Sequence, residues 1–132
     1  RMEVTSVLAA AAGSWVFGAI WYMTLSKPWL KAAGVVCDEN GRPKGGNNPT
    51  PFVLSALAMI LVAGMMRHIF AGSGVSTLGA GIVGGLGIGG FFIAPWVMIN
   101  NAYAGRPFVL TLIDGGYAVF GCAIIGAILT LF

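Results

Sequence analysis

Four long apolar segments constrain this sequence more than any other feature. They cover about residues 4–26, 51–71, 77–101 and 108–132, and each, as a helix, could cross about 30 Å of hydrocarbon. The composition agrees, because 58% of the residues are hydrophobic and 8% are charged, against about 25% charged in soluble domains. A soluble fold of 132 residues could not bury so much apolar surface. The sequence therefore predicts an all-α, polytopic membrane protein with four transmembrane helices in a single domain, residues 1–132.

The one substantial polar segment, residues 27–50, is rich in Gly, Pro and Asn and is predicted to be a loop. Basic residues prefer the cytoplasmic side of a membrane. Five of the seven flank the ends that the first and third connections share: Lys27, Lys31, Arg42, Lys44 and Arg106. The other two, Arg1 and Arg67, flank the opposite ends. We therefore expect a cytoplasmic loop and both termini on the other side. Nucleic-acid binding is not expected, because the net charge of +3 forms no basic face outside the membrane.

Small residues recur at four-residue spacing in two of the predicted helices. The first helix carries Ala10, Ser14 and Gly18, and the third carries Gly81, Gly85 and Gly89. Such stripes let another helix approach closely in lipid, so these residues are predicted to mediate helix packing. Further along the third helix, Pro95 cannot donate a backbone hydrogen bond and frees the carbonyl of Phe91, which predicts a kink.

A short pattern near the end of the first helix has an echo near the end of the third. Trp21-Tyr22-Met23 precedes Lys27-Pro28, and Trp96-Val97-Met98 precedes Arg106-Pro107. A true repeat would make two parallel-repeat helical hairpins about an axis along the membrane normal, with the small-residue stripes of helices one and three facing the bundle centre. Chance similarity is the competing interpretation.

The same residues carry a resemblance to a known family. Trp21-Tyr22, Lys27, Trp29 and Gly34 form a first cluster; Asn101, Gly105-Arg106-Pro107, Ile113-Asp114, Gly116-Tyr117 and Gly126 form a second. The chain resembles the small bacterial membrane proteins grouped as domain of unknown function 1761. The resemblance implies four spanning helices and a location in the bacterial inner (cytoplasmic) membrane. It implies no activity and no catalytic residues.

Asp114 is the only acid inside an apolar segment. It lies eight residues after Arg106, about 12 Å along a helix, where a charge must be paired, hydrated or protonated. One interpretation is an ion or proton site; the other is a polar clamp that fixes helix packing. The predicted intramembrane polar cluster consists of Asp114, Asn100, Asn101, Tyr117 and Tyr22.

The remaining aromatic and basic residues at the helix ends are interpreted as interfacial anchors: Trp21, Lys27, Trp29, Trp96 and Arg106. His68 is the only histidine, and Cys37 lacks the paired spacing of a zinc site, so no metal and no cofactor are expected. No nucleophile and base combination, paired carboxylates or phosphate loop occurs, so the protein is not expected to be an enzyme.

Three functional hypotheses remain open. The first is a helix-packing module that associates through its glycine faces, as a homo-oligomer or as an accessory subunit among other membrane-protein subunits. The second is a small transporter or channel that uses Asp114. The third is a binder of lipid, quinone or pigment. Membrane lipids are expected partners in every case.

Overall fold

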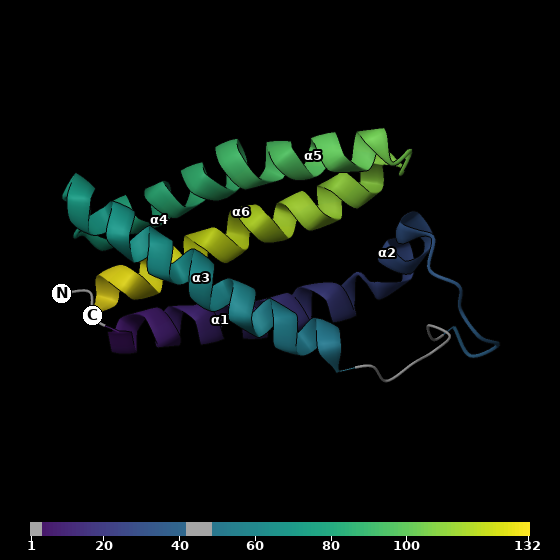
Figure 1. The fold of residues 1–132 in the computed structure, drawn as a ribbon, viewed down its shortest axis with the longest axis horizontal. Coiled ribbons are helices and arrows are strands. Elements are labelled where there is room, and N and C mark those ends of the chain that lie inside the picture. Colours follow the sequence, from purple (N-terminus) through teal and green to yellow (C-terminus); the bar gives the residue numbers. More distant parts are fainter. Residues whose placement is uncertain (1–3, 42–48) are drawn as a thin grey trace.

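The computed structural model describes residues 4–41 and 49–132, and the elements in these two ranges are helices (Figure 1). Each of the four spans is long and apolar enough to cross a membrane. The predicted helical, multi-pass membrane protein is therefore confirmed. The spans are α1 (Val4–Thr24), α3 (Thr50–Ser73), a third made of α4 (Leu78–Gly87), the π-helix η1 (Ile88–Ile93) and α5 (Ala94–Tyr103), and finally α6 (Phe108–Leu131).

A short helix corrects the prediction of a continuous loop over 27–50. α1 ends at Thr24, and α2 (Ser26–Ala33) follows almost at once. Pro28 lies in the first turn of α2, where its missing N–H costs no helical hydrogen bond. α2 ends at Gly34, whose φ of 72° is readily available only to glycine. The part of the predicted loop that holds Arg42 and Lys44 lies outside the described residues.

α6 is the central helix of the bundle. It packs against α1 on one side and against α4, η1 and α5 on another, while α3 packs mainly on α1 (Figure 1). In the most apolar window of α6, 39% of the residues are buried, against 11% for α3 and 11% for the third span. α6, and α1 with 33% buried, are therefore covered by protein more than the other two spans, which leave most of their residues unburied.

The hydrophobic core lies toward the end of the bundle where α1 begins. α3 contributes Met66 and Phe70, and α6 contributes Ile125 and Leu129, all at most 2% exposed. Ala10 of α1 completes this cluster with no exposed surface. Because these side chains are large and interlocked, this end of the bundle is closed.

The glycine stripe of the third span packs against the backbone of α6. A methyl group added at Gly81, Gly85 or Gly89 would collide with the carbonyl of Gly126, Cys122 or Ala118, respectively. These contacts advance by four residues on both antiparallel helices. The stripe therefore packs inside this chain, in what we call the α4–α6 seam.

The two hairpins are not equivalent in packing. A hairpin repeat would relate α1 to the third span and α3 to α6, yet α6 is central and α3 is peripheral. The small residues of α1 also pack against α6, since Gly18 lies against Tyr117 and Ser14 lies close to Gly121. The two stripes thus contact different sides of one helix and do not face each other across a symmetric centre.

The irregularity expected at Pro95 takes the form of a π-helix. Within η1 the backbone N–H of Ala94 bonds to the carbonyl of Gly89, five residues back. Proline removes the regular donor to the carbonyl of Phe91, and a wider turn just before it re-forms the backbone pairing. η1 contains Gly89, the last glycine of the α4–α6 seam, and leads directly into α5.

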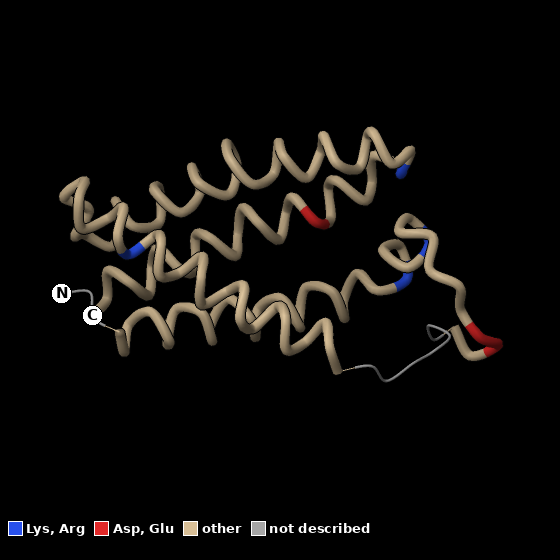
Figure 2. Tube along the Cα trace, viewed as in Figure 1, with Lys and Arg blue, Asp and Glu red and all other residues tan. Residues whose placement is uncertain are grey.

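The described basic residues lie at the two ends of the bundle, while Asp114 lies between them (Figure 2). Lys27 and Lys31 are on α2, and Arg106 is in the turn between α5 and α6 at the same end. Arg67 lies near the end of α3 at the opposite end. This separation agrees with spans that cross a low-dielectric layer.

Candidate functional site

A hydrogen-bonded carboxylate forms the centre of the candidate site. The Tyr22 hydroxyl of α1 donates to Asp114 Oδ1 at 2.7 Å, and the Trp29 indole of α2 donates to the same oxygen at 3.1 Å. Both donors therefore come from the amino-terminal part of the chain, while Asp114 comes from α6. They tie α1 and α2 to α6 within the membrane-spanning part of the bundle.

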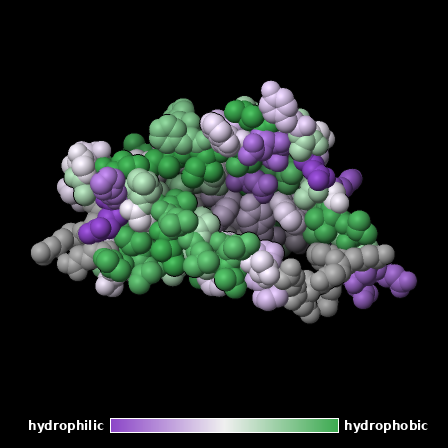
Figure 3. Space-filling model, viewed as in Figure 1, coloured by the Kyte–Doolittle hydropathy of each residue, from purple (hydrophilic) through white to green (hydrophobic). Residues whose placement is uncertain are grey.

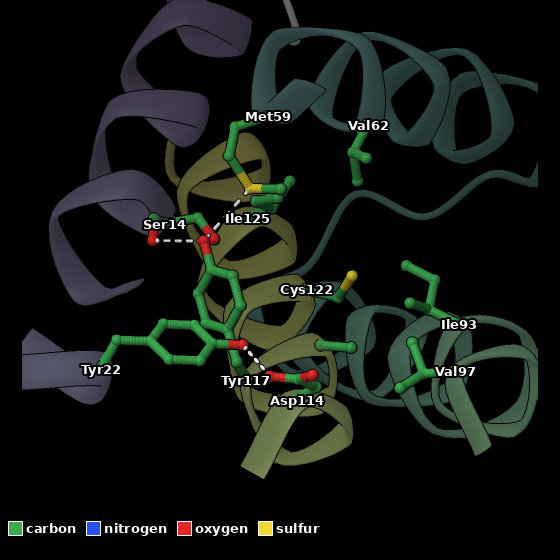
Figure 4. Close-up of a pocket in the computed structure, with 12 residues that line it drawn as sticks. Ser14, Tyr22, Met59, Val62, Ile93, Val97, Asp114, Tyr117, Cys122 and Ile125 are labelled. Atoms are coloured by element: carbon green, nitrogen blue, oxygen red, sulfur yellow. Dashed lines mark hydrogen bonds between the residues drawn. The ribbon is translucent and has the colours of Figure 1, made fainter. Parts of the chain in front are cut away.

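Tyr117 extends this group toward the middle of the bundle. Its hydroxyl donates to the backbone carbonyl of Ser14 at 3.1 Å and lies 3.5 Å from Met59 Sδ (Figure 4). Its ring meets the Tyr22 ring edge-on at 5.4 Å, and Tyr22 meets Trp29 edge-on at 5.9 Å. We call Tyr22, Trp29, Asp114 and Tyr117 the Asp114 cluster.

Small residues make room for the large aromatic side chains around this cluster. Gly18 lies directly against the Tyr117 ring, and Gly116 lies directly against the Trp21 ring. The Trp21 indole donates to the backbone carbonyl of Ile113 at 2.9 Å. Trp21 therefore links α1 to α6 through a hydrogen bond one residue before Asp114.

The basic residues near α2 lie just outside this aromatic layer. The Arg106 guanidinium rests against Gly34, so a side chain at residue 34 would collide with it. Lys27 is exposed on α2, and Trp96 is 68% exposed on α5. The role of these residues as interfacial anchors stays a prediction, whereas Trp21 and Trp29 also donate hydrogen bonds inside the bundle.

The two asparagines of the predicted cluster lie elsewhere. The Asn101 side chain donates to Thr111 Oγ1 at 3.2 Å, which links α5 to α6. Asn100 is exposed. The Asp114 carboxylate thus bonds to Tyr22, whose ring contacts Tyr117. Its second donor is Trp29, which the sequence predicts to be an interfacial anchor.

A groove of about 380 Å³ lies beside the Asp114 cluster. Asp114, Tyr22, Tyr117 and Ser14 contribute its polar atoms. Its remaining walls are apolar or thiol side chains and a glycine: Met59, Val62, Ile93, Val97, Ala118, Gly121, Cys122 and Ile125. Figure 3 shows a hollow between α3 and α5 whose floor is formed by residues of weakly hydrophilic colour, and Figure 4 shows the lining side chains converging from α1, α3, η1, α5 and α6.

One polar atom in the groove lining has no hydrogen-bond partner. Ser14 has no exposed surface, and its Oγ is unpaired. An unpaired buried hydroxyl costs about 1–3 kcal/mol, so such atoms are uncommon unless a ligand or water satisfies them. Ser14 lies in a stripe of small residues, which offers no sign that its hydroxyl is unpaired.

A second recess, of about 410 Å³, lies on the other side of α6 and has a different character. It is lined by Phe17, Trp21, Ile82, Phe120, Ala123, Ile124 and Ala127. The only side-chain polar atom among these is the Trp21 N–H, which already donates to the Ile113 carbonyl. Acyl chains of ordinary lipids suit such a surface, and it offers no group that would select a headgroup.

Within residues 4–41 and 49–132, no three His, Cys, Asp or Glu side chains gather as a metal site. Cys37 and Cys122 are free thiols, with Cys122 buried beside the groove. The chemistry that the described groove offers is therefore a carboxyl group at Asp114 and the aromatic side chains of Tyr22 and Tyr117, with the buried Ser14 hydroxyl behind them.

This fold and site define a small multi-pass membrane protein built around one hydrogen-bonded intramembrane carboxylate. Residues 5–130 match the family described as "Protein of unknown function (DUF1761)", and the chain belongs to that family. Comparisons with curated proteins and with solved structures find no significant match.

The two sequence clusters that carry the family resemblance meet in the structure. Tyr22 bonds to Asp114, Trp21 packs on Gly116, and Gly34 packs against Arg106. Residues about 70 to 95 positions apart in sequence therefore form one region. An amphipathic helix over Ser26–Ala33 would have predicted that Trp29 faces the bundle. Trp29 lies on the same face as the buried Ala32, whereas the exposed Lys27 and Lys31 lie on another face.

Proposed function

We propose that this protein binds a small amphiphilic molecule in the groove beside the Asp114 cluster. The headgroup lies at Asp114, and the apolar part lies against Met59, Val62 and Val97. The observation that carries the proposal is the combination of apolar walls with the Asp114 carboxylate, whose Oδ2 accepts no hydrogen bond among the described residues. Apolar pockets with a few convergent polar groups are typical of small-molecule sites.

The size of the groove is that of a small-molecule site. Ligand pockets commonly have volumes of about 300–1,000 Å³, and this groove has a volume of about 380 Å³. It therefore suits a headgroup with a short apolar moiety.

The proposed role is binding without a catalytic step. In the described ranges no histidine, cysteine or second carboxylate forms a reactive pair with Asp114, whose side-chain partners are Tyr22 and Trp29. The Tyr22 hydroxyl and the Trp29 indole hold and orient the carboxylate, and among the described residues no further hydrogen bond leads from either donor to a second titratable group. This arrangement favours a receptor site for a ligand over a reaction centre.

Organic extraction tests the proposal. The protein is isolated from its native membrane in a mild detergent, and the extract is analysed by mass spectrometry. We expect a small molecule in stoichiometric amount. Val62→Trp fills the groove and should remove it, whereas Leu61→Trp, on the 74% exposed neighbour, should retain it. Equal retention of the same molecules by both variants would contradict the proposal.

The hypothesis of a packing module that forms a homo-oligomer or joins other subunits stays a prediction. The α4–α6 seam uses Gly81, Gly85 and Gly89 within the chain, so association would need another surface. Transport through Asp114 also stays a prediction, and flux into protein-only liposomes, compared between the wild type and Asp114→Asn, would test it.

We further propose that the protein resides in a bacterial cytoplasmic membrane with residues 27–50 on the cytoplasmic side and both termini opposite. The described basic residues support this orientation, because Lys27, Lys31 and Arg106 share one end and Arg67 lies at the other. A reporter that is active only in the cytoplasm, fused after Phe132, should stay inactive. A strong signal would reverse the orientation.

A further inference from the structure

The two donors of the Asp114 cluster leave half of the carboxylate free. Tyr22 and Trp29 both donate to Oδ1, and in the described chain no hydrogen bond reaches Oδ2. An ionised carboxylate offers about four lone-pair positions on its two oxygens. Because Asp114 also lines the groove, its unused oxygen is available to a ligand there.

No basic side chain pairs with the Asp114 carboxyl group among the described residues. Lys27, Lys31 and Arg106 lie toward the α2 end of the bundle, and none of the three forms an ion pair with Asp114. An intramembrane charge without a counter-charge is costly, and a neutral hydrogen-bond donor offsets only part of that cost. A positive charge placed in the groove would complete the pairing.

The other groups that line the groove also favour a positively charged ligand. No lysine, arginine or histidine is among the lining residues, so nothing there attracts a carboxylate or phosphate headgroup. Tyr22 and Tyr117 line the groove next to Asp114 and meet each other edge-on. Aromatic rings attract cations electrostatically, most strongly when water is excluded.

We infer that the groove selects a lipophilic organic cation, with its charged centre at Asp114 Oδ2 beside Tyr22 and Tyr117 and its apolar groups against Met59, Val62 and Val97. This inference rests on the proposed binding function and names its ligand class. A molecule with an ammonium or phosphonium centre would place its charge at Asp114 and its apolar substituents against the apolar walls of the groove.

A pair of probes with similar shape and opposite charge tests the inference. Binding of tetraphenylphosphonium and of tetraphenylborate is measured on the purified protein in nanodiscs of zwitterionic lipid. We expect saturable binding of the cation, and affinity for the anion at least tenfold weaker. Asp114→Asn keeps an oxygen that accepts from Tyr22 and Trp29 but removes the charge, and it should weaken cation binding at least tenfold.

A matched variant separates the local charge from the overall charge. Glu39→Gln removes one negative charge at an exposed position outside the spans, and it should leave cation affinity within twofold. Val62→Trp should abolish binding, whereas Leu61→Trp should not. If Asp114→Asn does not fold, the preference of the wild type for the cation and the Val62 and Leu61 pair still decide the outcome.

The results distinguish failure of this inference from failure of the proposed function. If the anion binds as tightly as the cation and Val62→Trp blocks both, the groove is a binding site, but the inference that it selects cations is wrong. If the cation binds equally to the wild type and to Val62→Trp, the groove is not its site, and the inference is overturned. If no cation binds while the extraction experiment finds a groove-bound molecule, the ligand class is wrong and the binding function stands.

Discussion

The two sides of α6 differ in how closely the neighbouring helices approach. On the side of α4, Gly81, Gly85 and Gly89 let the two backbones touch, so that not even a methyl group fits between them. On the side where α3 and α5 flank α6, the helices are separated by a groove of about 380 Å³. The same central helix thus forms a closed seam and one wall of an open site.

This difference indicates how a small membrane protein keeps a polar site open. In lipid, helices gain little from burying apolar side chains against each other, and close packing of small residues provides much of the association energy. The α4–α6 seam provides such packing, and the core around Met66 and Phe70 closes the far end of the bundle. The groove can then remain unfilled, because the seam and the core hold its walls in place.

The largest expected effect comes from breaking the seam. Gly85→Ala would push a methyl group into the Cys122 carbonyl, and backbone cannot move aside as a side chain can. We expect a loss of about 3 kcal/mol in the free energy of unfolding, measured in mixed micelles by tryptophan fluorescence. Gly87→Ala, on the same helix with nothing near its added methyl group, should change stability by less than about 0.5 kcal/mol. Equal effects of the two variants would contradict the seam.

The strongest polar contact on the groove side should have the second-largest effect. Tyr22→Phe removes the 2.7 Å hydrogen bond to Asp114 Oδ1 and keeps the ring. Hydrogen bonds to charged groups are worth more than neutral ones, although bonds between membrane helices are modest, so we expect a loss of about 1.5 kcal/mol. Tyr103→Phe, at a position that is 91% exposed, serves as the matched control and should be neutral in the same unfolding assay.

Removal of the second donor should have a smaller effect. Trp29→Phe eliminates the longer bond of 3.1 Å while retaining an aromatic ring beside Tyr22. The expected loss is about 1 kcal/mol, and hydrogen exchange in α2 should rise, because this bond ties α2 to α6. Trp96→Phe, on the 68% exposed indole of α5, should change neither quantity. A similar rise in α2 exchange for both variants would show that the bond does not hold α2.

The smallest expected effect has the opposite sign. Ser14→Ala removes a buried hydroxyl that has no partner, so the ligand-free protein should gain about 0.5 kcal/mol of stability. Ser55→Ala is the matched control, because its hydroxyl accepts the Trp15 indole at 2.9 Å and its loss should destabilise the protein slightly. A loss of stability in Ser14→Ala would indicate that the hydroxyl is satisfied in solution.

The spans and their order were predictable from the sequence, whereas the members of the site were only partly so. The apolar segments and the isolated position of Asp114 indicated a membrane bundle with one intramembrane acid. Trp29 was interpreted as an anchor because the Gly- and Pro-containing segment 27–50 was predicted to be a loop, and α2 was not predicted within it. Asn100 was predicted to belong to the polar cluster with Asp114, but it is exposed on α5. Depth along a helix can be counted from sequence; the direction in which a side chain points depends on the rotation of the helix.

The sequence by itself determined that four helices cross a membrane, because unpaired backbone groups in lipid leave helices as the available structure for such apolar segments. It also determined that glycine would allow close contact somewhere. Only the tertiary structure decided that the contact lies between α4 and α6 and that the groove lies on the other side. The physical reason is that all faces of these helices are apolar, so hydrophobic patterning does not tell a lipid-facing surface from a packed one. The choice depends on how backbones and side chains fit together across the whole bundle.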